Sequence, residues 1–367
     1  MPTDLPADPL RFDAGAYDFD LPPELIAQEP LAERDASRLL VLERNSGRRA
    51  HRQFRELPEL LRPGDLLVRN RSRVFPARLL GRRVGGGAAE ILLVRQRETD
   101  LWEALVRPAR RLPPGARVDI APGFRALIEG GTPGPGAGTS LAGPLPTAAI
   151  RFVRLLSDDA QPADAIARHG HTPLPPYIRR TDNPSDRERY QTVFARETGS
   201  VAAPTAGLHF TPRLLERLAA RGIETAELIL HVGPGTFRPV AVPDVRAHEV
   251  DPERLVLPEA TALAIDRARD AGRRVLAVGT TTTRALESSL DARGRLRAGP
   301  AETALVIVPG FEFRVVSGLL TNFHLPRSSL LLLVSALAGR ERILDAYAEA
   351  VRARYRFYSY GDAMLVE

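Results

Sequence analysis

The arrangement of apolar segments changes near residue 160, and this change limits the folds that are open to the chain. Between about residues 74 and 158 the apolar segments are short, alternate with polar residues and follow one another closely, as in AEILLVRQ, WEALVRPA and AIRFVRL. That spacing is typical of a small antiparallel barrel or sandwich. Beyond about residue 160, strand-like segments alternate with helix-like segments, which indicates an α/β domain.

The N-terminal strands have no helices of their own, so we expect them to join this α/β domain. SRLLVLERNSGRRAHRQF indicates a strand, an Asn-Ser-Gly turn and a second strand. We therefore expect residues 1–73 and 159–367 to form one discontinuous main domain, which carries the catalytic site, and residues 74–158 to be inserted into it. A length of 367 residues agrees with two domains.

Within the main domain the pattern predicts individual elements. Helices are expected at 185–198, 211–221, 259–271, 281–291 and 340–355, and strands at 224–232, 273–279, 304–308 and 330–335. In the inserted domain, the Gly- and Pro-rich stretch at 130–147 is expected to be a flexible loop.

The composition excludes several kinds of chemistry. The chain has no cysteine, and all 51 of its Lys+Arg residues are arginine. Without lysine there is no Schiff base, no pyridoxal phosphate anchor and no Walker lysine; without cysteine there is no thiolate nucleophile and no iron–sulfur cluster. The arginines suit phosphate oxygens and nucleic-acid bases, but a GC-rich coding bias would give the same composition.

The chain is expected to be soluble and cytoplasmic, with no membrane partner. Its first residues lack the basic and apolar regions of a signal peptide. The longest apolar run, Leu330–Leu333 with its flanks, is shorter than the roughly 20 residues that a membrane span needs. We expect a monomer, although an oligomer stays open.

Two segments place a glycine-bearing turn after a strand. ELILHVGPGTFRPV (227–240) puts His231 at a strand end, and RRVLAVGTTTTRALESSL (273–290) runs from a strand through Gly279 into a helix that contains Arg284. Ligands of open α/β sheets bind at such strand ends, and helix N-termini attract anions. A carboxylate or phosphate at Gly279–Thr283 is one interpretation; a turn that only reverses the chain is the other.

Two further histidines and the C-terminal segment are ambiguous in the same way. His209 in SVAAPTAGLHFT and His324 in TNFHLP are able to act as acids or bases near neutral pH, or to serve as structural donors. YRFYSYGDAMLVE (355–367) is either a core strand with Asp362 capping a turn or an aromatic strip that stacks on a purine. No metal site is expected, because no HExxH motif occurs and the histidines are scattered.

These motifs, together with DLPPELIAQEP, RDASRLLVL, LPPYIRR and DRERYQTVFA, resemble the S-adenosylmethionine:tRNA ribosyltransferase-isomerase family over nearly the whole chain. The resemblance implies an α/β fold: a barrel-like α/β main domain with an inserted small antiparallel β-barrel domain. It also implies transfer and isomerisation of the ribosyl group of S-adenosylmethionine, a co-substrate, onto 7-aminomethyl-7-deazaguanine at the wobble position of tRNA. Epoxyqueuosine-tRNA, adenine and methionine are the implied products, and no metal takes part.

The sequence departs from the family pattern at two motifs and one loop. Asn70-Arg71-Ser72-Arg73 stands where similar sequences read Asn-Asp-Thr-Arg, and Asp251 stands where they have the second histidine of His-x-Met-His-x-Glu. The stretch at 130–147 has the character of an insertion. A carboxylate at position 251 is also able to accept a proton, so the base at that position stays open.

The implied reaction needs at least one base and one acid in a pocket that excludes water. The candidates, with roles unassigned, are His209, His231, His324, Asp251, Glu253 and Asp362. Residues expected to bind the donor are Gly233, Gly235, Thr236, Phe237, Gly279, Thr280, Thr281 and Arg284. Residues expected to follow RNA phosphates are Arg179, Arg180, Arg187 and Arg189, although a plain solvated face is an equal reading of that segment.

Two alternatives to this function stay open. A non-catalytic tRNA-binding paralogue would retain tRNA without releasing adenine. An S-adenosylmethionine-dependent transferase or nucleoside hydrolase with another acceptor would release adenine without needing the modified tRNA.

Overall fold

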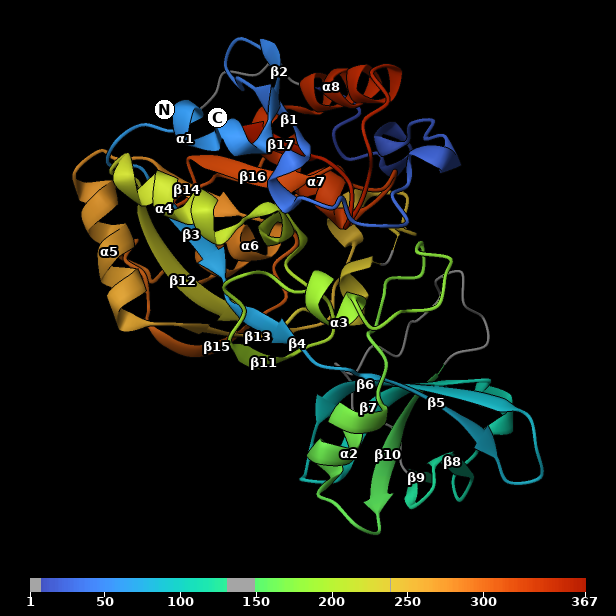
Figure 1. The fold of residues 1–367 in the computed structure, drawn as a ribbon. Coiled ribbons are helices and arrows are strands. Elements are labelled where there is room, and N and C mark those ends of the chain that lie inside the picture. Colours follow the sequence, from blue (N-terminus) through green and yellow to red (C-terminus); the bar gives the residue numbers. More distant parts are fainter. Residues whose placement is uncertain (1–7, 131–148, 238) are drawn as a thin grey trace.

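The computed structural model describes residues 8–130, 149–237 and 239–367, and consists of a large α/β body joined to a smaller β-barrel (Figure 1). The body is built on a nine-stranded sheet whose order is β15-β13-β12-β3-β14-β16-β17-β1-β2. Its strands are β1 (Arg38–Leu42), β2 (Arg49–Gln53), β3 (Leu66–Asn70), β12 (Glu224–Leu230), β13 (Glu253–Leu257), β14 (Val275–Val278), β15 (Gly299–Thr303), β16 (Gly318–Asn322) and β17 (Ala363–Val366).

The centre of the sheet is parallel, and antiparallel pairs occur toward both margins, although β17 and β1 are parallel to each other. β12, β3, β14 and β16 run in one direction, so their carboxyl ends reach the same edge of the sheet. β13 and β15 extend one margin, and the β1–β2 hairpin extends the other beyond β17. Parallel strands need crossover connections, and helices supply them here.

Those helices cover both faces of the sheet. The α-helices of the described residues are α1 (Leu57–Leu60), α2 (Pro162–His169), α3 (Asp186–Arg189), α4 (Pro212–Ala220), α5 (Glu259–Asp270), α6 (Thr280–Ser288), α7 (Ser329–Ala338) and α8 (Arg340–Arg352). Side chains of β1 show the two layers: Leu40 and Leu42 pack in the core with α5 to α8, whereas Leu39 and Val41 pack in the core with α1 and α4. Strands buried on both faces read as nearly continuous apolar runs, as β1 and β14 do here.

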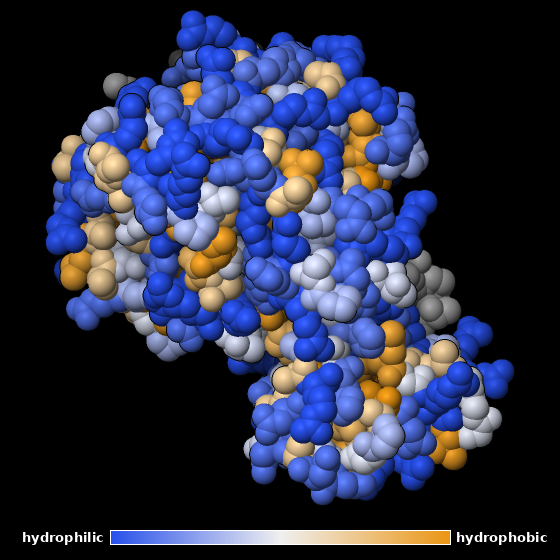
Figure 2. Space-filling model, viewed as in Figure 1, coloured by the Kyte–Doolittle hydropathy of each residue, from blue (hydrophilic) through white to orange (hydrophobic). Residues whose placement is uncertain are grey.

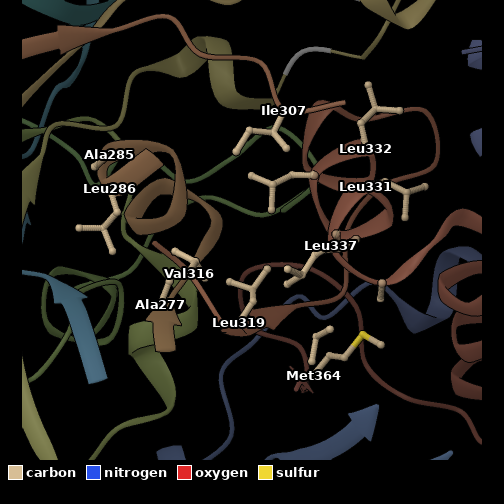
Figure 3. Close-up of a cluster of buried hydrophobic side chains, with 14 of the residues drawn as sticks. Ala277, Ala285, Leu286, Ile307, Val316, Leu319, Leu331, Leu332, Leu337 and Met364 are labelled. Atoms are coloured by element: carbon tan, nitrogen blue, oxygen red, sulfur yellow. The ribbon is translucent and has the colours of Figure 1, made fainter. Parts of the chain in front are cut away.

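The larger of these cores lies where α6 and α7 meet the sheet (Figure 3). Leu286 of α6, Leu331 and Leu332 of α7 and Leu319 of β16 are fully buried there. Each such leucine contributes about 1.5–3 kcal/mol through burial, so this layer holds both helices firmly against the strand ends that precede them.

The smaller part is a closed antiparallel barrel of six strands in the order β10-β7-β6-β5-β8-β9. Its strands are β5 (Arg78–Arg83), β6 (Ala88–Gln96), β7 (Leu101–Arg107), β8 (Arg117–Ala121), β9 (Phe124–Glu129) and β10 (Ala149–Ser157). Alternate residues such as Ile91 and Leu93 fill its interior, which is the period expected of strands with one buried side. Ala165 and Ile166 of α2 pack in the same core, beyond the expected boundary at residue 158.

Two neighbouring segments connect the barrel to the body. The chain enters the barrel after β4 (Ser72–Val74) and returns through α2 and α3 to β11 (Glu197–Ser200). β4 and β11 pair in parallel as a separate two-stranded sheet. The barrel is therefore held by a paired stem, and not by one loose linker.

The expected fold class is confirmed: the protein is an α/β structure with an inserted antiparallel β-barrel. The expected β1–β2 hairpin is present, as are helices and strands close to six of the predicted ranges. The loop expected at 130–147 lies, apart from Gly130, outside the described residues. Where the structure describes the chain, no helix is both long enough and apolar enough to cross a bilayer.

Three expected elements are wrong. The strand at 330–335 is instead the middle of helix α7, which Ser328 caps by accepting a hydrogen bond from the backbone N–H of Leu331 at 3.2 Å. The helix at 185–198 is only the four residues of α3, because the chain bends at Gln191, whose side chain bonds to both backbone groups of Val74. The strand at 304–308 is displaced to β15, since the Leu305 carbonyl accepts from Arg284 and not from a neighbouring strand.

Candidate active site

Three of the motifs found in the sequence meet at one edge of the sheet. His231 follows β12, Gly279 follows β14, and His324 lies two residues after β16. Because these strands are parallel, their carboxyl ends bring the three positions to the same edge. Ligands of open α/β sheets bind at such an edge.

The centre of this region is a buried ion pair between Glu253 and Arg284. Nη1 of Arg284 lies 2.6 Å from Oε2 of Glu253, and both side chains are less than a tenth exposed. Oε1 of Glu253 accepts hydrogen bonds from the backbone N–H of Gly233 and from Oγ1 of Thr236, each at 3.0 Å. The carboxylate thus joins α6 to the turn that follows β12.

The guanidinium of Arg284 is only partly satisfied. Its Nε donates to the carbonyl of Leu305 at 2.8 Å, and its Nη1 donates to Glu253. Its Nη2 is buried and has no hydrogen-bond partner within the described part of the chain. A buried donor without a partner is costly, so this atom is suited to a ligand that brings an acceptor.

A cavity of about 90 Å³ opens beside this pair. It is lined by residues of the body and by residues of the barrel, so it lies at the junction of the two. The site residues predicted from the sequence that line it are His231, Gly233, Gly235, Thr236, Asp251, Glu253 and Arg284. Phe237 closes the short 3₁₀ helix η7 (Pro234–Phe237), but its side chain lies outside the described residues.

His231 forms one wall of this cavity. Its imidazole packs on Gly199 of β11, and its Nδ1 is buried without a hydrogen-bond partner among the described residues. Burial, assisted by the positive charge of Arg254, lowers the pKa of His231. The ring is therefore neutral at pH 7 and able to accept a proton.

His209 lies away from that cavity, inside the body. Its Nδ1 is 2.8 Å from Oγ of Ser37, and its Nε2 accepts from the amide of Asn322 at 3.1 Å. Burial, with the charges of Arg34 and Arg356, lowers its pKa to about 3. These contacts fit a neutral ring that joins structural elements.

His324 is also buried and neutral, beside a second, smaller cavity. Its Nε2 lies 2.8 Å from Oγ1 of Thr321, and burial lowers its pKa to about 3. The cavity, of about 30 Å³, shares Thr236 with the first and is walled by Tyr177 and Tyr358, whose rings stack at 4.3 Å. Both cavities therefore border Thr236 of the η7 turn.

The carboxylate of Asp362 is bonded to groups that hold the fold together. Its carboxylate accepts from the backbone N–H of Arg38 and of Arg356, and also pairs with the Arg38 guanidinium at 2.9 Å. The interpretation of this segment as a core strand is confirmed, because β17 follows directly and is fully buried. Asp362 fixes the start of that strand.

The expected anion site at the start of α6 is covered by protein. Gly279 has φ of 91°, and a β-carbon there would lie 3.7 Å from that of Ala206 in the 3₁₀ helix η6 (Thr205–His209). Thr280 and Thr281 are buried beside it and do not line the cavity. Of this segment, only Arg284 reaches the cavity.

The four arginines expected to contact RNA differ from one another. Arg180 pairs with Asp186 through both of its terminal nitrogens, at 2.6 and 2.8 Å. Arg187 and Arg189 donate to backbone carbonyls of neighbouring segments. Arg179 is exposed, and its guanidinium has no partner among the described residues. Three of the four guanidinium groups therefore hold the body together.

The two motifs that depart from the family pattern, at Asn70–Arg73 and at Asp251, lie in different parts of the structure. Asn70 is buried and ties β3 to β12, because its side chain bonds to both backbone groups of Leu230, at 2.8 and 3.0 Å. Asp251 lines the first cavity. The described residues contain no cluster of three or more metal-binding side chains.

Sequence reasoning missed the residues that other segments bring to the cavity. Gly199 and Arg254 belong to the body, and Val94, Arg95 and Glu103 belong to the barrel. Arg254 follows Glu253 directly in β13. Because neighbouring residues of a strand face opposite sides, the exposure of Arg254 was predictable once Glu253 was assigned to the site. No sequence signal indicates which face of the barrel meets the body.

Known proteins resemble this chain over nearly its whole length. A family model described as queuosine biosynthesis protein matches residues 14–366. Proteins named S-adenosylmethionine:tRNA ribosyltransferase-isomerase are 51% identical in Moorella thermoacetica, over 95% of this chain and 98% of that one, and 52% identical in Thermus thermophilus, over 96% and 98%. The crystal structure of an S-adenosylmethionine tRNA ribosyltransferase from Thermotoga maritima aligns with a TM-score of 0.53 at 38% identity, over 96% of this chain and all of that one. The chain belongs to the S-adenosylmethionine:tRNA ribosyltransferase-isomerase family of queuosine biosynthesis.

Proposed function

We propose that the protein transfers and isomerises the ribosyl group of S-adenosylmethionine onto 7-aminomethyl-7-deazaguanine at the wobble position of tRNA. The products are epoxyqueuosine-tRNA, adenine and methionine, and the reaction takes place in the cytoplasm. Membership of the family over nearly the whole chain supports this activity. S-adenosylmethionine is the co-substrate, and no metal takes part.

The observation that carries the proposal is the incomplete bonding of Arg284. The methionine part of the donor carries a carboxylate and an ammonium group. In our proposal the carboxylate accepts from the unpartnered Nη2 of Arg284, and the neighbouring Glu253 attracts the ammonium group. The negative group of the methionine part thus faces the positive Arg284, and its positive group faces the negative Glu253. The carboxylate also gives the Nη2 of Arg284 a charge-assisted hydrogen bond, which this atom otherwise lacks.

The donor's own chemistry defines what the other residues do. The sulfonium acidifies the protons at C5′ of the ribose, so a base beside them starts the reaction. His231 is our candidate, because it lines the cavity, is neutral at pH 7 and has an unpartnered Nδ1. Asp251 lines the same cavity and is the second candidate for proton transfer.

We assign positioning roles to the other predicted residues. His209 and His324 have a pKa of about 3, so neither is an imidazolium that could act as the general acid at neutral pH. Asp362 is occupied by backbone and guanidinium donors. Of the arginines proposed to follow RNA, Arg179 is the one with an unoccupied guanidinium, and it remains our candidate in that segment.

One assay tests the function. The protein is incubated with S-adenosylmethionine and tRNA that carries the aminomethyl precursor, and mass spectrometry follows adenine and the epoxycyclopentane-bearing base. Release of both, dependent on the tRNA, is the expected result. Adenine release without the tRNA would indicate another acceptor, and tRNA binding without adenine release would indicate a non-catalytic protein; either result contradicts the proposal.

A further inference from the structure

A cleft of about 860 Å³ lies between the barrel and the body. One wall consists of Val94, Gln96, Arg97 and Trp102 of the barrel together with α2, which packs on the barrel, and the other includes Arg73, Arg254 and part of α3. The surface narrows between the two parts of the molecule (Figure 2). The cleft is much larger than the cavity beside Arg284, so it suits a larger ligand.

The cleft and that cavity are continuous. Val94, Gly199, His231 and Arg254 line both of them. His231 thus stands at the boundary between the two spaces, with its ring against Gly199. A ligand that fills the cleft is therefore able to place one group in the smaller cavity.

The charge of the cleft is mainly positive. Four arginines line it (Arg73, Arg97, Arg187 and Arg254), against a single carboxylate, that of Glu98. Arg73 and Arg254 are exposed, and neither guanidinium has a hydrogen-bond or ion-pair partner among the described residues. Unpaired guanidinium groups beside an open cleft favour a polyanion, and phosphates above all.

An aromatic pair lies in the same cleft. The rings of Phe75 and Trp102 are 5.4 Å apart and inclined by 33°. Trp102 is only 9% exposed, yet its indole N–H is buried without a hydrogen-bond partner in the described part of the chain. A buried indole donor normally has a partner, so this atom points to a ligand that supplies an acceptor.

We propose that this cleft binds the single-stranded nucleotides that flank the target base in the anticodon loop. Arg73 and Arg254 contact the phosphates, and Trp102 with Phe75 receives an unstacked neighbouring base, to which the indole N–H donates. The target base passes His231 into the smaller cavity. Unstacked bases on aromatic side chains and phosphates on arginines are the usual means of binding single-stranded RNA. This inference rests on the proposed function only in the choice of RNA.

The chain contains one tryptophan, so its fluorescence reports on this cleft alone. A synthetic anticodon stem–loop RNA is titrated into the full-length protein without donor. We expect saturable quenching of the Trp102 emission, and Trp102→Phe removes the signal. Heparin, a polyanion without bases, should bind in a salt-dependent way but leave the emission unquenched.

The arginines are tested with a matched pair of variants. The double variant Arg73→Gln and Arg254→Gln should weaken RNA binding and reduce the slope of log K against log salt by about 1.4, because two phosphate contacts to a single strand are lost. The control is Arg52→Gln with Arg82→Gln, which removes two exposed arginines outside the cleft. The control slope should equal that of the unmodified protein.

Two results would overturn the inference: unquenched emission at RNA concentrations that saturate adenine release, or equal loss of RNA binding in both double variants. Failure of the proposed function looks different. In that case the RNA still quenches Trp102, but no adenine appears with the precursor tRNA.

Discussion

The imidazole of His231 lies directly against the backbone of Gly199, so close that a β-carbon on Gly199 would be 2.8 Å from Cε1 of the ring. Glycine at this position thus sets where the ring stands between the cleft and the cavity. Gly199→Ala should displace the imidazole and reduce kcat by about 10²-fold, in line with the effect of a misplaced catalytic group. Adenine release under saturating substrates measures this.

The control for that change is Gly115→Ala in the barrel. Both glycines have positive φ, 146° at Gly199 and 85° at Gly115, but a β-carbon at Gly115 meets no atom within 4 Å. Gly115→Ala should cost some stability and leave kcat unchanged. Equal kcat in the two variants would exclude His231 from the reaction.

The ion pair between Glu253 and Arg284 should dominate the stability of the site. Glu253→Gln leaves the guanidinium buried and uncompensated, which we expect to lower the free energy of unfolding by about 3–5 kcal/mol. Urea unfolding measures the change. Glu43→Gln breaks the exposed pair with Arg48, and it should have little effect on unfolding. Similar losses in the two variants would show that burial of the first pair is unimportant.

The activity should depend on pH through His231. Burial and Arg254 lower the pKa of this imidazole, so kcat/KM should rise with pH through a pKa below about 6.5 and then become level. Arg254→Gln removes a positive charge that disfavours protonation, so it should raise the pKa and move the acidic limb to higher pH. An acidic limb that stays in place would assign it to another group.

Stability should also fall in acid because of His209. Its pKa is about 3 in the folded protein and about 6.5 in an unfolded chain, so the native state excludes a proton that the unfolded state binds. The stabilisation is complete above pH 6.5 and is lost as the pH falls toward 3. His209→Gln should reduce the slope of unfolding free energy against pH by about 1.4 kcal/mol per pH unit in that range. An unchanged slope would mean that His209 takes up a proton in the folded protein.

Much of the fold was predictable from local sequence patterns. The β1–β2 hairpin was predictable because Gly47, with φ of 73°, completes an Asn-Ser-Gly turn after the apolar run of β1. The apolar run at 330–335 was predicted incorrectly, because four consecutive leucines have no period that separates a strand from a buried helix. The serine cap at Ser328 and the packing against α6 are what favour a helix over a strand in this segment.

The site was predictable only in part, since its residues come from distant segments. Glu253 and Arg284 were both found, but their pairing across 31 positions follows from the contact between α6 and the turn after β12. His209 and His324 had the same sequence signal as His231, and only burial separates them. Trp102 belongs to a barrel strand that nothing in the sequence directs toward the body.

β17 lies inside the main sheet, between β16 and β1, although it is the last of the described strands in the chain. A ribosome therefore releases β1 and β2 long before β17, the other neighbour of β1, exists, while the barrel has all six of its strands by residue 157. We expect the nascent barrel to fold first and the hairpin of β1 and β2 to wait for residues 363–366. The main sheet would thus be completed only after residues 363–366 have left the ribosome, long after the barrel has formed.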